Sequence, residues 1–148
     1  VPAGSSIPGW NVKLGDKAQQ SVQFDVNHPE GKVFTMTSST RKDEMSLISP
    51  AVMVIPGKKM QFTALFRKNN SFSGNVATAI SAIRKNAGRD ELIDPLETKA
   101  PNQIRSAKWI MAKHTFGIPA NVVSIRLHIR GAFTGEVLVR NITLENRE

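Results

Sequence analysis

The stretch VVSIRLHIRGAFTGEVLVRNITL, residues 122–144, decides the fold. In its first half apolar and polar side chains alternate strictly, Val123, Ile125, Leu127 and Ile129 against Ser124, Arg126, His128 and Arg130. Because successive side chains of a β-strand face opposite sides of the sheet, the pattern predicts a strand with one apolar and one basic face. Such a strand needs a sheet packed behind its apolar side, and it leaves its basic side available for binding.

The second half of this stretch predicts another strand with an irregularity inside it. Residues 131–135, GAFTG, interrupt the alternation, and the apolar set Val137, Val139, Ile142 and Leu144 follows. Its apolar positions change parity between Val139 and Ile142, because two residues separate this pair instead of one. An extra residue in a strand is a β-bulge, so we expect a bulge at Arg140 and Asn141.

Length and charge limit the classes of protein to which the chain can belong. Its 148 residues are enough for one domain with a substantial core and few for two. The net charge of +8 and the pI near 10.2 favour polyanionic partners such as acidic glycans, nucleic acid or anionic membrane surfaces. A basic surface that is only solvated is the alternative, because charge alone carries no specificity.

Several kinds of protein are excluded by what the sequence lacks. Without Cys there are no disulfides, no Cys-ligated zinc and no thiol catalysis. No apolar run approaches the roughly 18 residues of a membrane-spanning helix. The first ten residues, VPAGSSIPGW, have neither the basic nor the apolar region of a signal peptide, so a secreted protein would be present here as a mature segment.

The remainder of the chain predicts further strands. Residues 1–9 read as a linker or extended lead-in, and residues 10–148 as a single domain. Residues 59–68 alternate as clearly as the opening stretch, with Met60, Phe62, Ala64 and Phe66 against Gln61, Thr63, Leu65 and Arg67. Residues 76–85 favour a strand, whereas residues 39–44 and 86–106 are expected to be irregular connections. About eight strand candidates without an amphipathic helix predict an all-β fold, a β-sandwich jelly roll of two antiparallel sheets.

Several motifs in a fixed order resemble a known family. They are PGK at 56–58 before MQFTALFR, Trp109 before TFGIP at 115–119, the alternation from 123 to 129, and GEVLVRNITL at 135–144. Together they resemble the jelly-roll carbohydrate-binding modules with a galactose-binding-domain-like fold, over about residues 10–146. The resemblance implies a non-catalytic module, secreted or at the cell surface, that brings a parent polysaccharide-degrading enzyme and its other domains to a polysaccharide.

The resemblance also bears on a metal site. The family usually carries an Asp-Asp or Asp-Asn pair in its last strand, and the first Asp often binds a structural calcium. Here the pair is Arg140 and Asn141. Calcium needs several oxygen ligands, and an Arg repels it, so we expect no calcium and no other cofactor, with Asn141 as the remaining candidate ligand.

In this family the ligand cleft is the concave outer face of one sheet, where polar groups bind sugar hydroxyls and an aromatic ring stacks on the sugar. The candidate ligand-binding residues are therefore Gln61, Thr63, Arg67, Phe72, Trp109, Arg126, His128 and Arg130. The best cluster is predicted to be Arg67 with Arg126, His128 and Arg130, because guanidinium groups grip carboxylates and sulfates, and this favours an acidic glycan. The alternatives are a solvated strand face for the cations and core packing for Trp109. Alternation cannot show which sheet carries the cleft.

Catalysis finds little support in the sequence. There is no GxSxG, no HExxH and no Gly-rich phosphate loop, and the paired carboxylates fall in expected connections. His114 and His128 lack a third ligand at a recognisable spacing, so a zinc site is not expected. The alternative function is a β-sandwich that binds nucleic acid or protein through the same basic face. Against nucleic acid stands the lack of aromatic residues interleaved with Lys and Arg.

Overall fold

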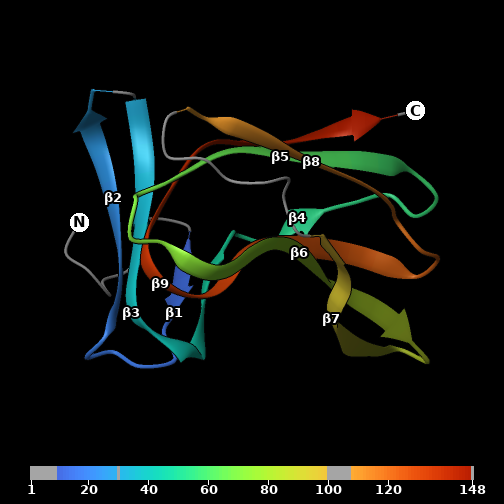
Figure 1. The fold of residues 1–148 in the computed structure, drawn as a ribbon. Coiled ribbons are helices and arrows are strands. Elements are labelled where there is room, and N and C mark those ends of the chain that lie inside the picture. The colour runs from blue at the N-terminus through green and yellow to red at the C-terminus, as the bar shows by residue number, and fades with distance from the viewer. Residues whose placement is uncertain (1–9, 30, 100–107, 148) are drawn as a thin grey trace.

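The computed structural model describes residues 10–29, 31–99 and 108–147, and the predicted lead-in at residues 1–9 lies outside them. The strands are β1 (Asn11–Lys13), β2 (Gln20–His28), β3 (Gly31–Ile48), β4 (Val52–Met53), β5 (Lys59–Lys68), β6 (Ser73–Asn86), β7 (Arg89–Lys99), β8 (Ile110–Gly117) and β9 (Val122–Arg147) (Figure 1). None of the described residues forms a helix, so this part of the chain holds no helix that could cross a membrane. The prediction of an all-β fold is confirmed.

Two long strands build both layers of the sandwich. β3 has 18 residues and β9 has 26, and the two pair antiparallel along most of their lengths. The second half of β9 pairs with β5, which continues to β8, and the first half of β3 pairs with β2. The first half of β9 instead pairs with β4 and with β6, which continues to β7, and β1 pairs with the end of β3. We call these layers the β5 sheet and the β6 sheet.

The core lies between the two sheets and is made by the alternating strands. Met60, Phe62, Ala64 and Phe66 of β5 and Ile125, Leu127 and Ile129 of β9 are all buried, as the alternation predicts. Val123, which the alternation places with them, is only half-buried, and its neighbour Val122 is buried in the core instead. Each large apolar side chain that is fully buried contributes about 1.5–3 kcal/mol relative to exposure. The jelly-roll core therefore rests on the two stretches of sequence with the strictest period of two.

The predicted bulge is confirmed at Arg140 and Asn141. The register between β5 and β9 shifts there, because Leu65 pairs with Arg140 whereas Thr63 pairs with Thr143. Asn141 has a φ of 53°, in the left-handed region that Asn tolerates better than most residues. The extra residue restores the parity of Ile142 and Leu144 toward the core, against which both are packed.

Three expectations about connections are wrong. β3 runs through residues 39–44 with a register shift between Thr40 and Met45, and β9 runs through residues 131–135 without a break. Residues 89–99 form β7 instead of an irregular stretch. In the first two cases pairing between β3 and β9 overrides weak local propensity. In the third, positive φ angles at Ala87 and Gly88 make a tight hairpin that pairs the charged residues of β7 with β6.

Candidate functional site

The outer face of the β6 sheet is arched, with β1 and β3 bending down on one side and β7 on the other (Figure 1). Its middle strand, β9, presents Arg126, His128 and Arg130 on this face. Opposite them on β6 stand small residues, Ser81, Ala79 and Ala77. Small neighbours leave room above the strand for a ligand.

Two hollows lie along this face. One of about 330 Å³ is lined by Lys13, Glu44, Ser46, Ile48, Asp94, His128 and Arg130. The other, of about 160 Å³, is lined by Ala51, Ser81, Ala82, Ile83, Leu92, Ser124, Ile125 and Arg126. We call them the Arg130 hollow and the Arg126 hollow. The first is polar and the second is mostly apolar, so the face changes in character along β9.

A chain of hydrogen bonds, here the Arg130 network, runs along the floor between the hollows. Ser81 Oγ lies 2.7 Å from His128 Nε2, and His128 Nδ1 lies 3.1 Å from an Arg130 guanidinium nitrogen. The same guanidinium nitrogen pairs with Asp94 Oδ1. Because a guanidinium can only donate, Nδ1 of His128 must accept, and the Nε2–H must donate to Ser81. The hydrogen-bond pattern assigns one tautomer of neutral His128.

Burial keeps His128 uncharged at neutral pH. Desolvation and the charge of Arg130, with a smaller effect of Arg126, lower the pKa of His128 to about 4 against the opposing effect of Asp94. The predicted row of three cationic residues therefore holds two cations at pH 7. The neutral tautomer also points its proton at Ser81, so His128 cannot act as the base that would activate this hydroxyl as a nucleophile.

An aliphatic row crosses the face next to Arg126. The pairing registers align Met53 of β4, Ser124 of β9, Ile83 of β6 and Leu92 of β7 across four strands. Met53 and Leu92 are among the most exposed large apolar side chains of the described residues. Arg126 itself donates to the Ser49 carbonyl oxygen at 3.0 Å, which fixes its guanidinium beside this row. The Arg126 hollow thus combines aliphatic surface with a held cation.

The other predicted residues lie on the outer face of the β5 sheet. Gln61 donates to Thr115 Oγ1 at 3.3 Å, and the Thr63 and Thr143 hydroxyls are hydrogen bonded to each other. The guanidinium carbons of Arg67 and Arg140 lie 5.1 Å and 4.3 Å from the ring centre of Trp109. These contacts engage the polar groups of this face with one another.

The predicted cluster of Arg67 with Arg126, His128 and Arg130 does not form. β5 and the first half of β9 belong to different sheets, and their apolar sides face the same core. Their polar sides consequently point away from each other. Only Arg126, His128 and Arg130 are brought together.

Two further aromatic and titratable candidates are engaged in packing. Phe72, in the loop between β5 and β6, is half-buried with its ring centre 5.3 Å from that of Phe133. His114 is buried between the sheets, within 3.2 Å of Thr78 Oγ1 and of Glu97 Oε1. Asn141 is exposed at the bulge, and no group of three or more His, Asp or Glu suited to a metal gathers among the described residues.

The site also contains residues that the sequence did not indicate, namely Lys13, Glu44, Ser46, Ser81 and Asp94. Asp94 belongs to β7, which the sequence predicted as irregular, and Ser81 lies in a run that reads as generic strand. Their proximity to β9 depends on strand order. No local pattern of residues could have supplied it.

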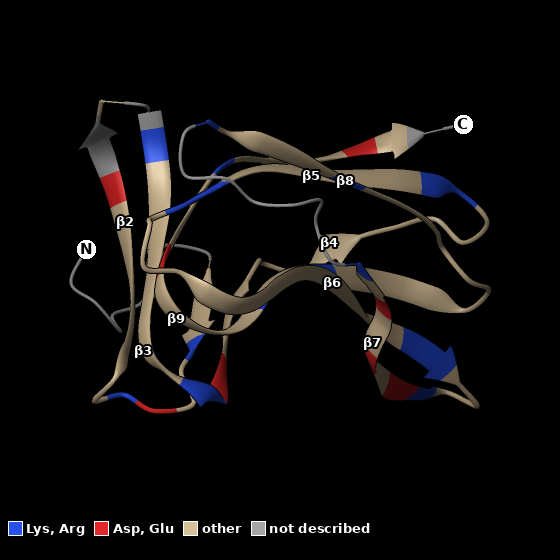
Figure 2. Ribbon diagram, viewed as in Figure 1, with Lys and Arg blue, Asp and Glu red and all other residues tan. Residues whose placement is uncertain are grey.

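Charge is spread over the molecule and is not concentrated on this face. Figure 2 shows Lys and Arg on several strands, with Asp and Glu beside them on β7 and near the turn of β3. On the β6 and β7 hairpin, Arg84 pairs with Glu91 and Lys85 with Asp90. The cations are therefore dispersed over several strands, and some of them are paired locally with carboxylates.

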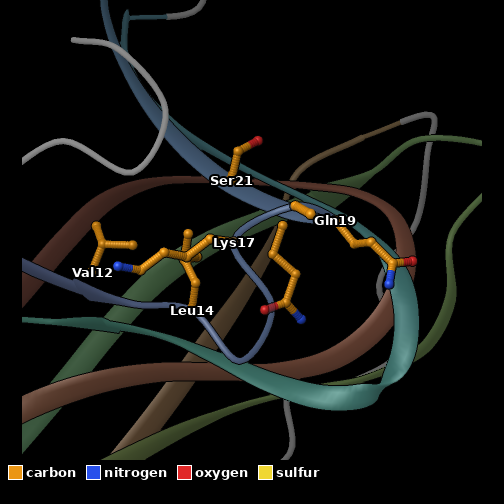
Figure 3. Close-up of a pocket in the computed structure, with 7 residues that line it drawn as sticks. Val12, Leu14, Lys17, Gln19 and Ser21 are labelled. Atoms are coloured by element: carbon orange, nitrogen blue, oxygen red, sulfur yellow. The ribbon is translucent and has the colours of Figure 1, made fainter.

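A third hollow, of about 560 Å³, lies between β1 and the start of β2 (Figure 3). It is lined by Val12, Leu14, Lys17, Ala18, Gln19, Gln20 and Ser21. The Gln20 amide accepts from the N–H groups of Gly15 and Asp16 at 2.8 Å and 3.0 Å, and donates to the Asp43 carbonyl oxygen at 2.7 Å. Its hydrogen bonds hold the turn at residues 14–19, so the Gln20 amide is engaged within the fold.

No protein-family model and no curated protein matches the chain. Solved structures share its fold. A xylan-binding domain of Paenibacillus barcinonensis Xyn10C, CBM22-2, matches with a TM-score of 0.61 and 10% identity over 96% of this chain and 94% of that one. A Clostridium thermocellum xylanase 10B structure with CBM22-1 and GH10 modules matches with a TM-score of 0.67 and 14% identity over 95% of this chain.

A domain of the bacteriophage CBA120 tailspike protein 4 has the same fold, with a TM-score of 0.68 and 10% identity over 94% of this chain. The chain spans 19% of the tailspike structure and 26% of the xylanase structure. At these identities the comparisons establish the fold. The predicted jelly-roll β-sandwich fold is confirmed.

Proposed function

We propose that this chain is a non-catalytic carbohydrate-binding module that holds a polysaccharide along the arched face of the β6 sheet. The observation that carries the proposal is the pair of hollows on one strand face. Arg126 lines one hollow and Arg130 the other, and the two residues are four positions apart on β9, a rise of roughly 13 Å along the strand. That spacing suits an extended chain of sugar units better than a single sugar.

The chemistry of the two hollows fits a glycan. A sugar carries hydroxyl groups, which donate and accept hydrogen bonds, and C–H surfaces, which pack on apolar side chains. The Arg130 hollow supplies both donors and acceptors, among them Ser46, Glu44 and Asp94. The aliphatic row at Met53, Ile83 and Leu92 supplies the apolar contact that an aromatic ring provides in other sites. Xylan is the first polysaccharide to try, since several structures with this fold are described as xylan-binding.

The proposal has two more specific parts, namely that the polysaccharide is acidic and that the module belongs to a larger enzyme. The net charge of +8 and the exposed Lys13 and Arg126 favour a polymer with occasional carboxylates. A parent secreted enzyme is supported by the xylanase structure in which a module of this fold is joined to a GH10 module. In that setting the module would raise the local concentration of its enzyme on the polymer.

Affinity gel electrophoresis tests the proposal. The protein is run through gels containing neutral xylan, polygalacturonate, heparin or DNA, at low and at high salt. We expect retardation by at least one of the two plant polysaccharides. Retardation by heparin or DNA alone, falling steeply with salt through counterion release, would overturn it in favour of a nucleic-acid-binding role.

Two variants locate the site. Arg126→Gln on the arched face should weaken retardation, and Lys113→Gln, on the outer face of β8, is its matched control. Both residues are exposed, so neither change should alter the fold. Equal retardation of the two variants would place the site elsewhere while leaving the function standing.

A further inference from the structure

The Arg130 network leaves hydrogen-bonding groups pointing at the Arg130 hollow. A guanidinium has five N–H groups. One nitrogen of Arg130 serves both His128 and Asp94, and the other three N–H groups have no partner within the described ranges. Asp94 uses Oδ1 for the pair, and its side chain keeps 35% of its surface exposed. A donor and an acceptor therefore stand side by side at the edge of one hollow.

The charges of this hollow are balanced. Its lining includes two cations, Lys13 and Arg130, and two carboxylates, Glu44 and Asp94, while His128 is neutral. An incoming carboxylate would gain from the first pair and be repelled by the second. A neutral group that both donates and accepts hydrogen bonds is repelled by neither the cations nor the carboxylates. The hollow consequently favours hydroxyl groups over acidic ones.

We infer that Arg130 and Asp94 form a subsite for two neighbouring hydroxyl groups of one neutral sugar ring, and that His128 is the positioning residue that holds this pair in register. The inference rests on the proposed function and adds its ligand chemistry. Arg130 donates to one hydroxyl oxygen, and Asp94 accepts from the next hydroxyl along the ring. His128 contributes through its fixed tautomer, because it accepts from Arg130 while anchored to Ser81.

Burial restricts the conformations that the side chains of Arg130 and His128 can adopt. The Arg130 side chain is only 17% exposed, and His128 is buried. A side chain held from two sides by a carboxylate and an imidazole loses little conformational entropy when it binds a ligand. Pre-organised polar groups of this kind discriminate strongly, because a ligand that lacks the matching hydroxyl leaves them unpaired.

Protonation of His128 would dismantle the arrangement. A charged imidazole has two N–H donors and cannot accept from Arg130, and it adds a third positive charge beside Arg130 and Arg126. The opposing carboxylates are Asp94, which pairs with Arg130, and Glu44 across the hollow, with Lys13 as a further cation there. Acid is therefore expected to weaken binding through His128 in addition to any effect of the carboxylates.

The decisive experiment measures the affinity for soluble neutral xylan of the unchanged protein and four variants by titration calorimetry. Arg130→Gln and Asp94→Asn should each lose about tenfold or more, the size of a charge-assisted hydrogen bond. His128→Gln keeps an acceptor and a donor and should stay within about threefold of the unchanged protein, whereas His128→Leu should lose about tenfold. Circular dichroism confirms that each variant is folded.

The pH profile separates positioning from packing. Between pH 6 and about pH 3.5 the unchanged protein should lose about fourfold through the titration of His128, and His128→Gln should lack this component. The carboxylates are common to both proteins, so their contribution cancels. Parallel profiles would overturn the role of His128, and full affinity in Arg130→Gln and Asp94→Asn would overturn the subsite. Absence of binding to every polysaccharide by the unchanged protein would instead overturn the proposed function and the subsite with it.

Discussion

The two outer faces of the sandwich carry similar polar and charged side chains, but these side chains make different contacts on each face. On the β5 sheet, polar groups pair among themselves, Thr63 with Thr143 and Gln61 with Thr115, and Trp109 contacts two guanidinium groups. On the β6 sheet, Arg130 is held by two partners and still presents N–H groups to a hollow. The difference shows that the composition of a strand face does not determine a binding site. What matters is whether small residues on the neighbouring strand leave space, and whether polar groups keep hydrogen-bonding capacity after packing.

The largest effect that separates the faces should be the dependence of stability on pH. The folded pKa of His128 is about 4, below the ordinary value of 6.5, so the unfolded chain binds a proton first as pH falls. Stability from this group is complete above pH 6.5 and is lost as pH falls to 4, by roughly 3 kcal/mol. Denaturant unfolding at several pH values measures this loss.

His128→Gln is the matched variant for that experiment. It cannot titrate, so its unfolding free energy should fall less between pH 6.5 and 4 than that of the unchanged protein. All other groups are the same in both proteins, so their contributions to the pH dependence subtract out. Identical slopes for the two proteins would mean that His128 is solvated in the folded state, and the contrast between the faces would then be lost.

A smaller effect is expected on the β5 sheet. Trp109→Ala removes a half-buried ring and its contacts with Arg67 and Arg140. We expect a loss of about 1–2 kcal/mol in unfolding free energy, since each cation–π contact contributes about 0.5–1 kcal/mol and some packing is lost too. Affinity for xylan should be unchanged. Loss of binding at full stability would show that the ligand lies on the β5 sheet.

The sequence predicted the sandwich and its core because those depend on local periodicity. Period-two alternation at Phe62 and at Ile125 shows directly which side chains face inward, and a change of parity identified the bulge at Arg140. The sequence could not predict that residues 89–99 form the strand β7. The charged hairpin after Asn86 forms because β7 pairs with β6, and its residues have little strand propensity of their own. Nor could the sequence tell that two polar strand faces lie on opposite sides of the molecule, which follows only from strand order.

The set of residues that forms the site was the hardest feature to predict from the sequence, because it also depends on strand order. Arg126, His128 and Arg130 were found because they share one strand. Asp94 is brought to Arg130 by the register shift between β6 and β7, in which Ile93 pairs with Ala82 and Glu97 with Ile80. Such a shift depends on the packing of both strands. The charge state of His128 likewise depends on its burial. The alternation alone placed this side chain on the solvent side of the strand.

The smallest expected effect concerns the aliphatic row. It distinguishes directly which of the two outer faces contacts the ligand. Leu92 on the arched face is 64% exposed and Met111 on the β5 sheet is 49% exposed, so changing either to Ser should alter stability by no more than about 0.5 kcal/mol. Leu92→Ser should nevertheless weaken xylan binding by roughly threefold, because less than one kcal/mol of apolar contact with the sugar is removed. Met111→Ser should bind as the unchanged protein does. Equal affinities would confine the ligand to the polar Arg130 hollow, whereas a loss in Met111→Ser alone would reverse the assignment of the faces.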